Sequence, residues 1–404
     1  MNKNLVVGLP TSSFLPAVGG AEIGLHNIAI ELINNNCSPV IIIPFRSYLY
    51  LKKKKYHLPY TIIPFPPKIR ELTIFSPKTS FCFFNLYMSV IDWFFKIDIY
   101  HVTSAFPAGV LITQFVKKNH KPVIIRAIGS DIQIDESIGY GQRLNKKVDL
   151  LIKKHIHNAN LLIATTQTVF KDYKKLNIPE KKLVEIPNGV NLNHFNIIVK
   201  KHKIRKRLGI SNNAFIFLSV GRYHPKKGYE YLLEAVKSLK EKVKNEFIVL
   251  IVGKDLDQLD NRVNELNIKD NIKFIDSILN IKEKDNELAL PSTELVEIYK
   301  IADTFVMPSL LETFGIVLVE AMASRLPIIS TSAPGCIDVI ENGKYGYMVP
   351  AGDSETLSDA MLSFINNKEL IKSYSKLSLF ASKKYDWNNI VKQYLGIYKQ
   401  ILDY

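Results

Sequence analysis

Two segments of the 404-residue sequence combine charged side chains with glycine in a way that suits anion binding. In the first, residues 221–228, Arg222 and Lys227 flank a turn that contains Pro225. A guanidinium presents a fork of N–H donors and an ammonium group presents a compact charge, so the two side chains could share one diphosphate. The alternative interpretation is that these charged residues lie on a surface loop that binds no ligand.

The second segment, residues 303–324, carries two glutamates, Glu312 and Glu320. We expect a strand that ends at Pro308 and a helix that begins near Gly315. Glu320 falls within an apolar stretch of that helix, where a buried carboxylate needs a partner, and carboxylates accept hydrogen bonds from sugar hydroxyls. Free N–H groups at the start of the helix would receive a phosphate or a hydroxyl, and they belong to Phe314, Gly315, Ile316 and Val317. Glutamates on an exposed helix surface are the alternative.

A third segment places Gly19 and Gly20 before a helix that begins near Ala21. Adjacent glycines let the backbone approach a ligand closely, and the start of a helix favours an anion. An ordinary tight turn fits the same residues. The spacing is not the GxGxxG of a dinucleotide-binding fold.

The elements that must position these segments are short apolar strands alternating with helices. Runs such as residues 5–9, 40–43, 123–125, 161–164, 215–220 and 247–252 are typical of parallel strands that are buried on both faces. They predict an α/β protein with two doubly wound domains, and in such sheets the ligand lies beyond the carboxyl ends of the strands. We place the domains at residues 1–195 and 196–385, with residues 386–404 completing the first.

Composition agrees with a globular, two-domain protein. The chain is longer than the roughly 250–300 residues at which a single core stops growing, and 47% of it is hydrophobic. The three cysteines show no close pairing, so neither a disulfide framework nor a zinc ribbon is expected. The apolar run before Pro10 is too short for a signal peptide, and we expect a cytoplasmic protein.

Positive charge is concentrated in the first half of the chain. Residues 1–200 hold 25 Lys and Arg against 12 Asp and Glu, whereas residues 201–404 hold 28 against 26. Lysine clusters, and the basic run at residues 200–207, suit an anionic membrane surface or nucleic acid, and a merely solvated face fits them equally. The most apolar window, residues 81–95, is too short to span a bilayer and predicts either a buried helix or a membrane-facing one.

Taken in order, these segments resemble glycosyltransferase family 4, the retaining glycosyltransferases of the GT-B fold. The resemblance covers nearly the whole chain, and its motifs are specific as an ordered set although none is decisive alone. They lie at residues 19–22, 101, 129–131, 188–195, 221–228, 302–320, 334–335 and 342–353. The resemblance implies two Rossmann-like domains facing a cleft, an N-terminal one for the acceptor and a C-terminal one for the donor. The last helix, near residues 387–398, would cross back onto the first domain.

The resemblance also implies roles for individual residues. The catalytic group would be Glu312, Arg222, Lys227 and Asp131. The donor would be bound by Gly19, Gly20, Arg222, Lys227, Glu312, Phe314, Gly315, Ile316, Val317 and Glu320. The acceptor side would include His101, Ser130, Asp131 and Asn188. No metal and no cofactor other than the nucleotide-diphosphate sugar co-substrate is implied.

The chain departs from the family pattern at three places. Ile128 stands where the family often has a histidine near the acceptor, with Arg126 two residues earlier. Asp338 replaces a common glutamate, and a charged insertion at residues 280–288 falls where the base pocket is expected. These departures leave the acceptor and the nucleotide base open.

The function that the resemblance implies is retaining transfer of a sugar from a nucleotide-diphosphate sugar to a lipid-linked or growing glycan, in polysaccharide or cell-envelope synthesis. An anionic membrane surface is an expected partner, which would place the protein peripherally at the inner face of a membrane. No nucleic-acid partner is expected, because the chain has no recognised module for one. Two alternatives remain: a nucleotide-sugar epimerase of the same fold, and a non-catalytic glycan-binding protein.

Overall fold

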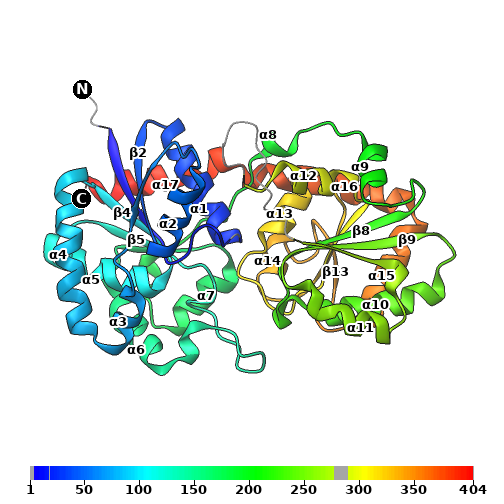
Figure 1. Ribbon diagram of the computed structural model, residues 1–404, viewed down its shortest axis with the longest axis horizontal. Helices are drawn as coiled ribbons and strands as arrows, with labels where there is room; N and C mark the ends of the chain where they lie inside the picture. Colours follow the sequence, from blue (N-terminus) through cyan, green and yellow to red (C-terminus); the bar gives the residue numbers. More distant parts are fainter. Residues whose placement is uncertain (1–3, 18, 277–289, 404) are drawn as a thin grey trace. The chain divides into compact units, whose positions relative to one another are not determined.

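The computed structural model describes residues 4–17, 19–276 and 290–403, and the chain divides into two compact units. Unit 1 contains the described residues up to Asn188, together with Leu290 and the segment from Trp387 onward. Unit 2 runs from Gly189 to residue 276 and from Pro291 to Asp386. Each unit is built around one sheet (Figure 1). The charged insertion predicted at residues 280–288 lies outside the described residues.

The sheet of unit 1 has seven parallel strands in the order β3-β2-β1-β4-β5-β6-β7. Its central strands are almost completely buried because helices cover both faces, which explains their continuous apolar sequences. The strands are β1 (Leu5–Pro10), β2 (Cys37–Ile43), β3 (Thr61–Pro64), β4 (Ile99–Thr103), β5 (Val123–Arg126), β6 (Leu161–Ala164) and β7 (Leu183–Glu185).

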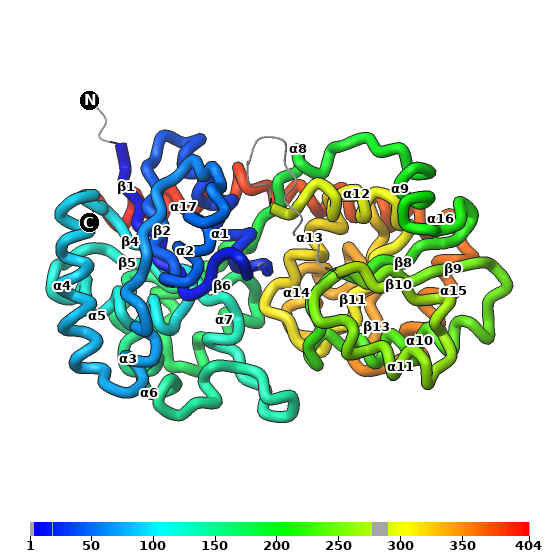
Figure 2. The backbone as a smooth tube through the Cα atoms, viewed as in Figure 1, coloured from blue at the N-terminus to red at the C-terminus, as the bar shows by residue number. Residues whose placement is uncertain are grey.

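The helices of unit 1 connect these strands in sequence order, with one exception. They are α1 (Gly20–Asn34), α2 (Phe45–Lys54), α3 (Ile69–Phe75), α4 (Pro77–Phe95), α5 (Val110–Asn119), α6 (Lys146–His155), α7 (Gln167–Lys175) and α17 (Trp387–Leu402). The exception is α17, which comes from the end of the chain and packs beside α1, as Figure 2 shows. The predicted return of the last helix to the first domain is therefore confirmed.

Helix α4 has two different faces. Phe84, Met88 and Ile91 are buried in the core of unit 1, whereas Leu86 and Trp93 are exposed. The prediction of a buried helix for the apolar window at residues 81–95 therefore holds for one side of α4, and the other side is exposed. None of the helices in the described part of the chain combines the length and the apolar character that a bilayer crossing requires.

The sheet of unit 2 has six parallel strands in the order β10-β9-β8-β11-β12-β13. The strands are β8 (Phe215–Val220), β9 (Phe247–Val252), β10 (Ile272–Ile275), β11 (Thr304–Met307), β12 (Ile328–Thr331) and β13 (Tyr347–Val349). The helices are α8 (Leu192–Phe195), α9 (Lys201–Arg207), α10 (Tyr229–Lys242), α11 (Asp260–Glu265), α12 (Thr293–Ile301), α13 (Ile316–Ala323), α14 (Cys336–Val339), α15 (Ser354–Asn366) and α16 (Lys368–Ser382). The prediction of two doubly wound α/β domains is confirmed.

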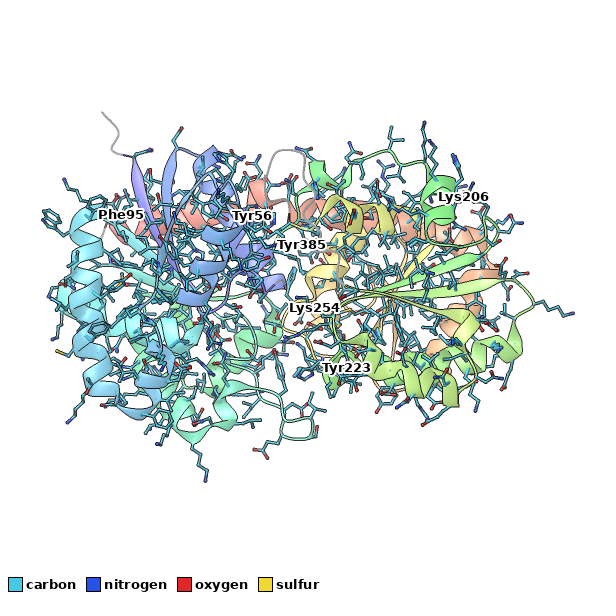
Figure 3. All side chains as sticks on the ribbon, in the orientation of Figure 1. Tyr56, Phe95, Lys206, Tyr223, Lys254 and Tyr385 are labelled. Atoms are coloured by element: carbon cyan, nitrogen blue, oxygen red, sulfur yellow. The ribbon has the colours of Figure 1, made fainter. Side chains whose placement is uncertain are left out.

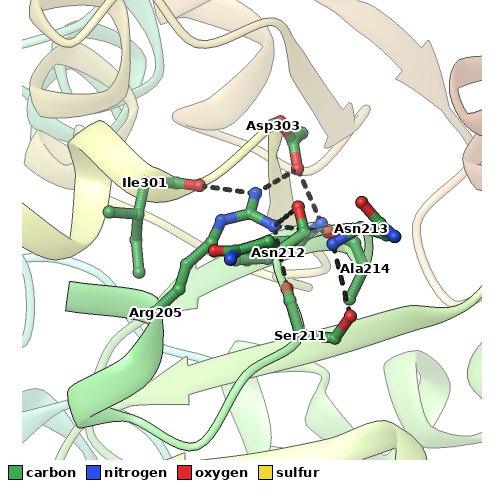
Figure 4. Close-up of polar contacts among 8 residues, drawn as sticks. Arg205, Ser211, Asn212, Asn213, Ala214, Ile301 and Asp303 are labelled. Carbon is green, nitrogen blue, oxygen red and sulfur yellow. Dashed lines mark hydrogen bonds and ion pairs between the residues drawn. The ribbon is translucent and has the colours of Figure 1, made fainter. Parts of the chain in front are cut away.

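Arg205 is the one inward-pointing cation of the basic run at residues 200–207 (Figure 4). Its Nη1 donates to the carbonyl oxygens of Ser211, Asn212 and Ala214, at 2.8 to 3.2 Å. Its Nη2 donates to the carbonyl of Ile301 at 3.3 Å and to Asp303 Oδ2 at 3.2 Å. The guanidinium therefore ties α9 to the loop before β8 and to the end of α12, so this cation is not available to an external anion.

We expect Arg205→Met to destabilise unit 2 by about 2–4 kcal/mol, because it removes a donor from several carbonyl oxygens and leaves the Asp303 carboxylate with the N–H of Ile216 but without its ion pair. Urea denaturation followed by circular dichroism measures the loss. The control is Lys206→Met, which removes an exposed cation one residue away on the same helix (Figure 3). Equal stability of the two variants would show that the Arg205 hydrogen bonds contribute nothing.

Candidate active site

The charged residues of unit 2 lie at the carboxyl ends of two neighbouring strands, β8 and β11. The loop after β8 contains one 3-10 turn, Pro225–Lys227, whose N-cap is His224. Gly228 follows with a φ of +65°, and a Cβ there would lie 2.0 Å from the carbonyl oxygen of Pro308. Leu310 N–H donates to the Lys226 carbonyl at 2.7 Å. The two loops are thus joined by direct backbone contact, which only glycine permits at position 228.

Lys227 and Glu312 form an ion pair at this edge of the sheet. Lys227 Nζ lies 2.6 Å from Glu312 Oε1 and donates a hydrogen bond to it. Ser309 Oγ donates to the same oxygen at 3.3 Å, and Lys226 Nζ lies 3.8 Å from Glu312 Oε2. Glu312 and Ser309 are buried. Lys227 and Glu312, which the resemblance placed in one catalytic group, are therefore in contact.

The electrostatic environment of this pair remains positive. Burial alone would raise the pKa of Glu312, but Lys227 and Lys226 outweigh it and hold the pKa at about 2. The carboxylate is therefore ionised at every working pH. Arg222 is exposed on the same loop, which therefore carries three cations, Arg222, Lys226 and Lys227. The pKa of His224 is lowered by burial and then by Lys226, which keeps its imidazole neutral. The surplus charge suits a polyanionic ligand such as a diphosphate.

Glu320 is buried in α13, as predicted, and its carboxylate is only half paired. Tyr299 Oη, from α12, donates to Glu320 Oε2 at 2.8 Å. Within the described part of the chain Oε1 has no hydrogen-bond partner. Burial raises the pKa of Glu320 to about 7, against which the Tyr299 hydrogen bond acts. A buried carboxylate with an unused oxygen has capacity for further donors, such as the hydroxyls of a sugar or ribose.

The start of α13 lies on the same loop as Glu312. Gly315 is its N-cap, with a φ of +76°, and the four residues predicted to offer N–H groups to a ligand, Phe314, Gly315, Ile316 and Val317, surround this helix start. The backbone N–H of Glu312 donates to the Pro334 carbonyl at 2.9 Å. Three loop segments, after β8, after β11 as far as the start of α13, and after β12, therefore meet at one edge of the unit 2 sheet.

In unit 1 the predicted site residue Asp131 joins two loops. It is buried, and its Oδ2 accepts a hydrogen bond from the backbone N–H of Ala105 at 2.5 Å. Its Oδ1 accepts from the N–H groups of Ile128 and Gly129 at 3.1 and 3.0 Å. Burial raises the pKa of Asp131, while these hydrogen bonds act in the opposite direction. Both oxygens thus serve the backbone, and the geometry gives Asp131 a positioning role for the loops after β4 and β5.

Asn188 and Ser130 lie near the carboxyl ends of the unit 1 strands as well. Asn188 Oδ1 accepts a short hydrogen bond from Arg126 Nη1. Arg126 is fully buried, and its Nε and Nη2 have no hydrogen-bond partner in the described part of the chain. Its Nη2 faces α1, where a Cβ on Gly24 would approach it to 3.0 Å. Ser130 Oγ is half buried and accepts from Gln142 Nε2 at 3.4 Å.

His101 lies in the core of unit 1 and not at the end of a strand. It is in the middle of β4, its Nδ1 is 2.6 Å from Tyr398 Oη, and its ring centroid is 4.8 Å from that of Tyr394. Burial, followed by Arg126, lowers its pKa well below the usual value. The structure therefore places this residue as a neutral packing partner of α17, apart from the loops that hold Asp131 and Ser130.

The glycine loop of unit 1 leads directly into α1. Gly19 is the N-cap residue, in an extended conformation, and Gly20 is the first residue of the helix. A Cβ on Gly19 would lie 3.2 Å from Glu22 Oε2. The helix start that the sequence predicted for an anion is therefore present after β1.

Three residues with direct contacts in these sites were not assigned from the sequence. Lys226 was passed over for its neighbour Lys227, although the 3-10 turn brings both ammonium groups to Glu312. Tyr299 has no recognisable spacing from Glu320, because its contact depends on how α12 packs against α13. From the sequence, Arg126 was noted only as lying two positions before Ile128. In the structure its Nε and Nη2 have no hydrogen-bond partner in the described part of the chain.

Family models match the chain on both sides of residue 195. Residues 18–194 match the model described as Glycosyltransferase Family 4, and residues 200–379 match the model described as Glycosyl transferases group 1. Each match falls almost entirely within one of the two units.

Curated relatives are similar to the chain over different lengths. The phosphatidyl-myo-inositol mannosyltransferase of Mycobacterium leprae is 31% identical over 221 residues, which are 54% of this chain and 54% of that protein. The alpha-monoglucosyldiacylglycerol synthase of Acholeplasma laidlawii is 24% identical over 413 residues, 98% of this chain and 97% of that one. The chain spans only a little more than half the length of several relatives, the mycobacterial one included.

Solved structures share the architecture. The crystal structure of the Anabaena protein HepE in complex with UDP-glucose has a TM-score of 0.76 and is 18% identical, covering 98% of this chain and 100% of that one. At this level of identity the likeness shows the fold alone. The GT-B fold predicted from the sequence is confirmed.

Proposed function

We propose that this chain, which belongs to glycosyltransferase family 4, transfers a sugar from a nucleoside diphosphate sugar to a lipid-linked or growing glycan. The observation that carries the proposal is the surplus of positive charge around the Lys227–Glu312 pair at the carboxyl edge of the unit 2 sheet. An anionic diphosphate would compensate that charge, and the half-paired Glu320 would accept hydroxyl donors of the same molecule.

In the proposed reaction the bond between the anomeric carbon and the diphosphate oxygen breaks, and the acceptor hydroxyl oxygen bonds to that carbon. The acceptor proton leaves, and the nucleoside diphosphate departs with an additional negative charge. Lys227 and Arg222 stabilise that charge as it develops, which is the kind of electrostatic stabilisation that contributes most to many enzymatic rates. Glu312, held ionised by Lys227, stands beside the transferred sugar and orients the lysine that meets the leaving group.

Retention of the anomeric configuration and independence from metal ions are parts of the same proposal. Retention is what the resemblance to the retaining glycosyltransferases of family 4 implies. The three cations Arg222, Lys226 and Lys227 supply positive charge at the place where a divalent ion would otherwise act. The acceptor is proposed by chemical class, with support from two relatives whose names specify transfer to lipid, the mannosyltransferase and the diacylglycerol synthase. The basic first half of the chain supports a location at the inner face of a membrane.

Incubation with radiolabelled donors in the presence of EDTA tests the reaction. UDP-glucose is the first donor to try, since HepE was crystallised with it, followed by other UDP-, GDP- and ADP-sugars. We expect label to pass into a lipid or glycan fraction only when acceptor is present, and NMR of the new linkage should show retained configuration. Epimerised donor in the absence of acceptor would identify an epimerase and contradict the proposal. Unchanged donor in every combination would favour a non-catalytic glycan-binding protein.

Donor binding should depend on pH through Glu320. Only the ionised carboxylate accepts two hydroxyl hydrogen bonds, and burial places the pKa of Glu320 at about 7. Affinity for the nucleotide sugar should therefore fall about tenfold between pH 8 and pH 6. Calorimetric titration measures it, and a nucleotide sugar is the right probe because its phosphate diesters do not titrate in this range. An affinity that is flat across this range would remove Glu320 from the donor site. Glu312, with a pKa of about 2, cannot produce the effect.

A further inference from the structure

The outer face of α4 concentrates exposed apolar side chains. Of the sixteen large hydrophobic residues that are exposed in the described part of the chain, five lie on α4 and one, Phe75, is the last residue of α3, two positions before α4. The five are Phe83, Leu86, Val90, Trp93 and Phe94, with 51 to 79% of each side chain exposed. Their spacing of three, four, three and one residues keeps them on one side of the helix. Such a stripe on a surface helix marks a contact with another phase or molecule.

Charge around this stripe is mainly positive, although the carboxylate of Glu71 is exposed on the neighbouring helix α3. The only acidic residue of α4 is Asp92, and it is held by Lys121 Nζ at 2.9 Å and by Tyr100 Oη at 2.8 Å. Lys78 near the start of the helix and Lys96 immediately after its end are both exposed. The apolar face is thus bounded by lysine and presents no free carboxylate of its own helix.

The neighbouring helices also carry exposed apolar side chains and lysines. Helix α5 packs next to α4 in unit 1 (Figure 1), and α6 packs against α5 and meets α4 where the ring of His155 contacts Phe81. Lys147 Nζ of α6 lies 5.6 Å above the ring centre of Phe75, and Leu150 of α6 is a further exposed apolar residue. Exposed lysines on α5 and α6 add positive charge, namely Lys117, Lys118, Lys146, Lys147 and Lys154, whereas Lys153 is paired with Asp149 at 2.6 Å. We call the six apolar residues together with Leu150 and these lysines the α4 face.

From this combination we infer that the α4 face docks onto an anionic lipid surface, with α4 lying in the plane of the headgroups and its aromatic stripe entering the apolar layer. Aromatic and aliphatic side chains framed by lysine are the features that hold a helix at a bilayer interface. A second copy of this chain is an unfavourable partner, because two α4 faces would bring like charges together. The many lysines also argue against an ordinary protein–protein interface, because lysine is depleted in such interfaces. The inference gives the proposed membrane location a defined surface, and its test does not depend on catalysis.

The chain contains its own fluorescent probe for this contact. It has two tryptophans: Trp93, with 79% of its side chain exposed on the α4 face, and Trp387, which is 1% exposed. On addition of phosphatidylcholine vesicles that contain phosphatidylglycerol, we expect the protein to float with the vesicles and the emission of Trp93 to shift to the blue. Trp93→Phe should keep flotation and lose the shift. Pure phosphatidylcholine vesicles should bind less, and high salt should weaken the binding to anionic ones.

Two variants separate the α4 face from general stickiness. Leu86→Glu places a carboxylate in the exposed stripe and should lower the vesicle-bound fraction about tenfold. Phe380→Glu makes the same change at an apolar residue of α16 that is also exposed, at 59%, and should leave binding unchanged. Both sites are at the surface, so both variants should fold.

Three results would overturn the inference. The first is absence of flotation with anionic vesicles at low salt. The second is flotation without a shift of Trp93, which would mean that lysines alone touch the lipid. The third is a dimer, detected by light scattering without vesicles and abolished by Leu86→Glu, which would assign the face to a second copy. Loss of vesicle binding would leave sugar transfer to a soluble acceptor intact, and loss of transfer would leave vesicle binding intact, so the two proposals fail separately.

Discussion

The Lys227→Met variant should transfer sugar about 10²- to 10³-fold more slowly than the unchanged protein, the usual result of removing one preorganised donor to a developing negative charge. Met keeps the length of the side chain and removes only the ammonium group. The residual rate comes from Arg222 and from Lys226, which lies 3.8 Å from Glu312. The measurement is kcat/KM for transfer of labelled sugar, with circular dichroism to show that the variant is folded.

Two further variants sharpen this result. Lys226→Met should cost less than Lys227→Met, since its ammonium group is the more distant one from Glu312. Glu312→Gln should also lower the rate strongly, because an amide cannot hold Lys227 as the 2.6 Å ion pair does. A folded Lys227→Met or Glu312→Gln variant with the activity of the unchanged protein would refute the assignment of this pair to catalysis.

Glu320→Gln should weaken donor binding and at the same time stabilise the ligand-free protein. Gln keeps a partner for Tyr299, and it removes a charge that is buried without a second hydrogen bond. The folded-state pKa of Glu320, about 7, lies above the ordinary 4.5. Its contribution to stability is therefore fully present below pH 4.5 and is lost as the pH rises through 7. At pH 8 the variant should gain about 1–3 kcal/mol, and near pH 4.5 it should gain almost nothing.

The loss on the binding side should be about tenfold or more in the dissociation constant of the nucleotide sugar, as expected when hydrogen bonds to a charged group are weakened. Urea denaturation at the two pH values gives the stability, and calorimetric titration at pH 8 gives the affinity. Opposite signs of the two effects are typical of a residue retained for function at the expense of stability. A variant that is less stable at pH 8, with unchanged affinity, would show that Glu320 is a structural residue.

The fold was largely predictable because its signals are local. The apolar runs at residues 215–220 and 247–252 became β8 and β9 with the predicted limits. Ser292, a capping residue in the sequence, is the N-cap of α12, and Gly315 is that of α13. Each of these signals is contained within a few residues, so no knowledge of tertiary packing is needed to read it.

Contacts between distant segments were not predictable in the same way. His101 and Tyr398 are 297 positions apart, and only the packing of α17 on β4 shows that the histidine is enclosed. Arg205 belongs to a run of basic residues that looks uniformly exposed in sequence, yet its guanidinium serves carbonyl groups of unit 2. The apolar window at residues 81–95 did not reveal which side chains of α4 face the core, because apolar residues occur on both the buried and the exposed side of the helix. In each case tertiary packing decides the role of a residue whose type alone is ambiguous.

The most direct test of the account is calorimetric titration of the purified protein with UDP, GDP and ADP in the presence of EDTA, repeated with the double variant Lys227→Met/Glu320→Gln. The account predicts that at least one nucleoside diphosphate binds the unchanged protein without metal. It also predicts that the double variant, folded by circular dichroism, loses this binding by about 100-fold, because one charge contact to the phosphates and one hydroxyl acceptor are removed together. Absence of binding by all three nucleotides, or equal binding by the double variant, would contradict the donor site at the carboxyl edge of the unit 2 sheet.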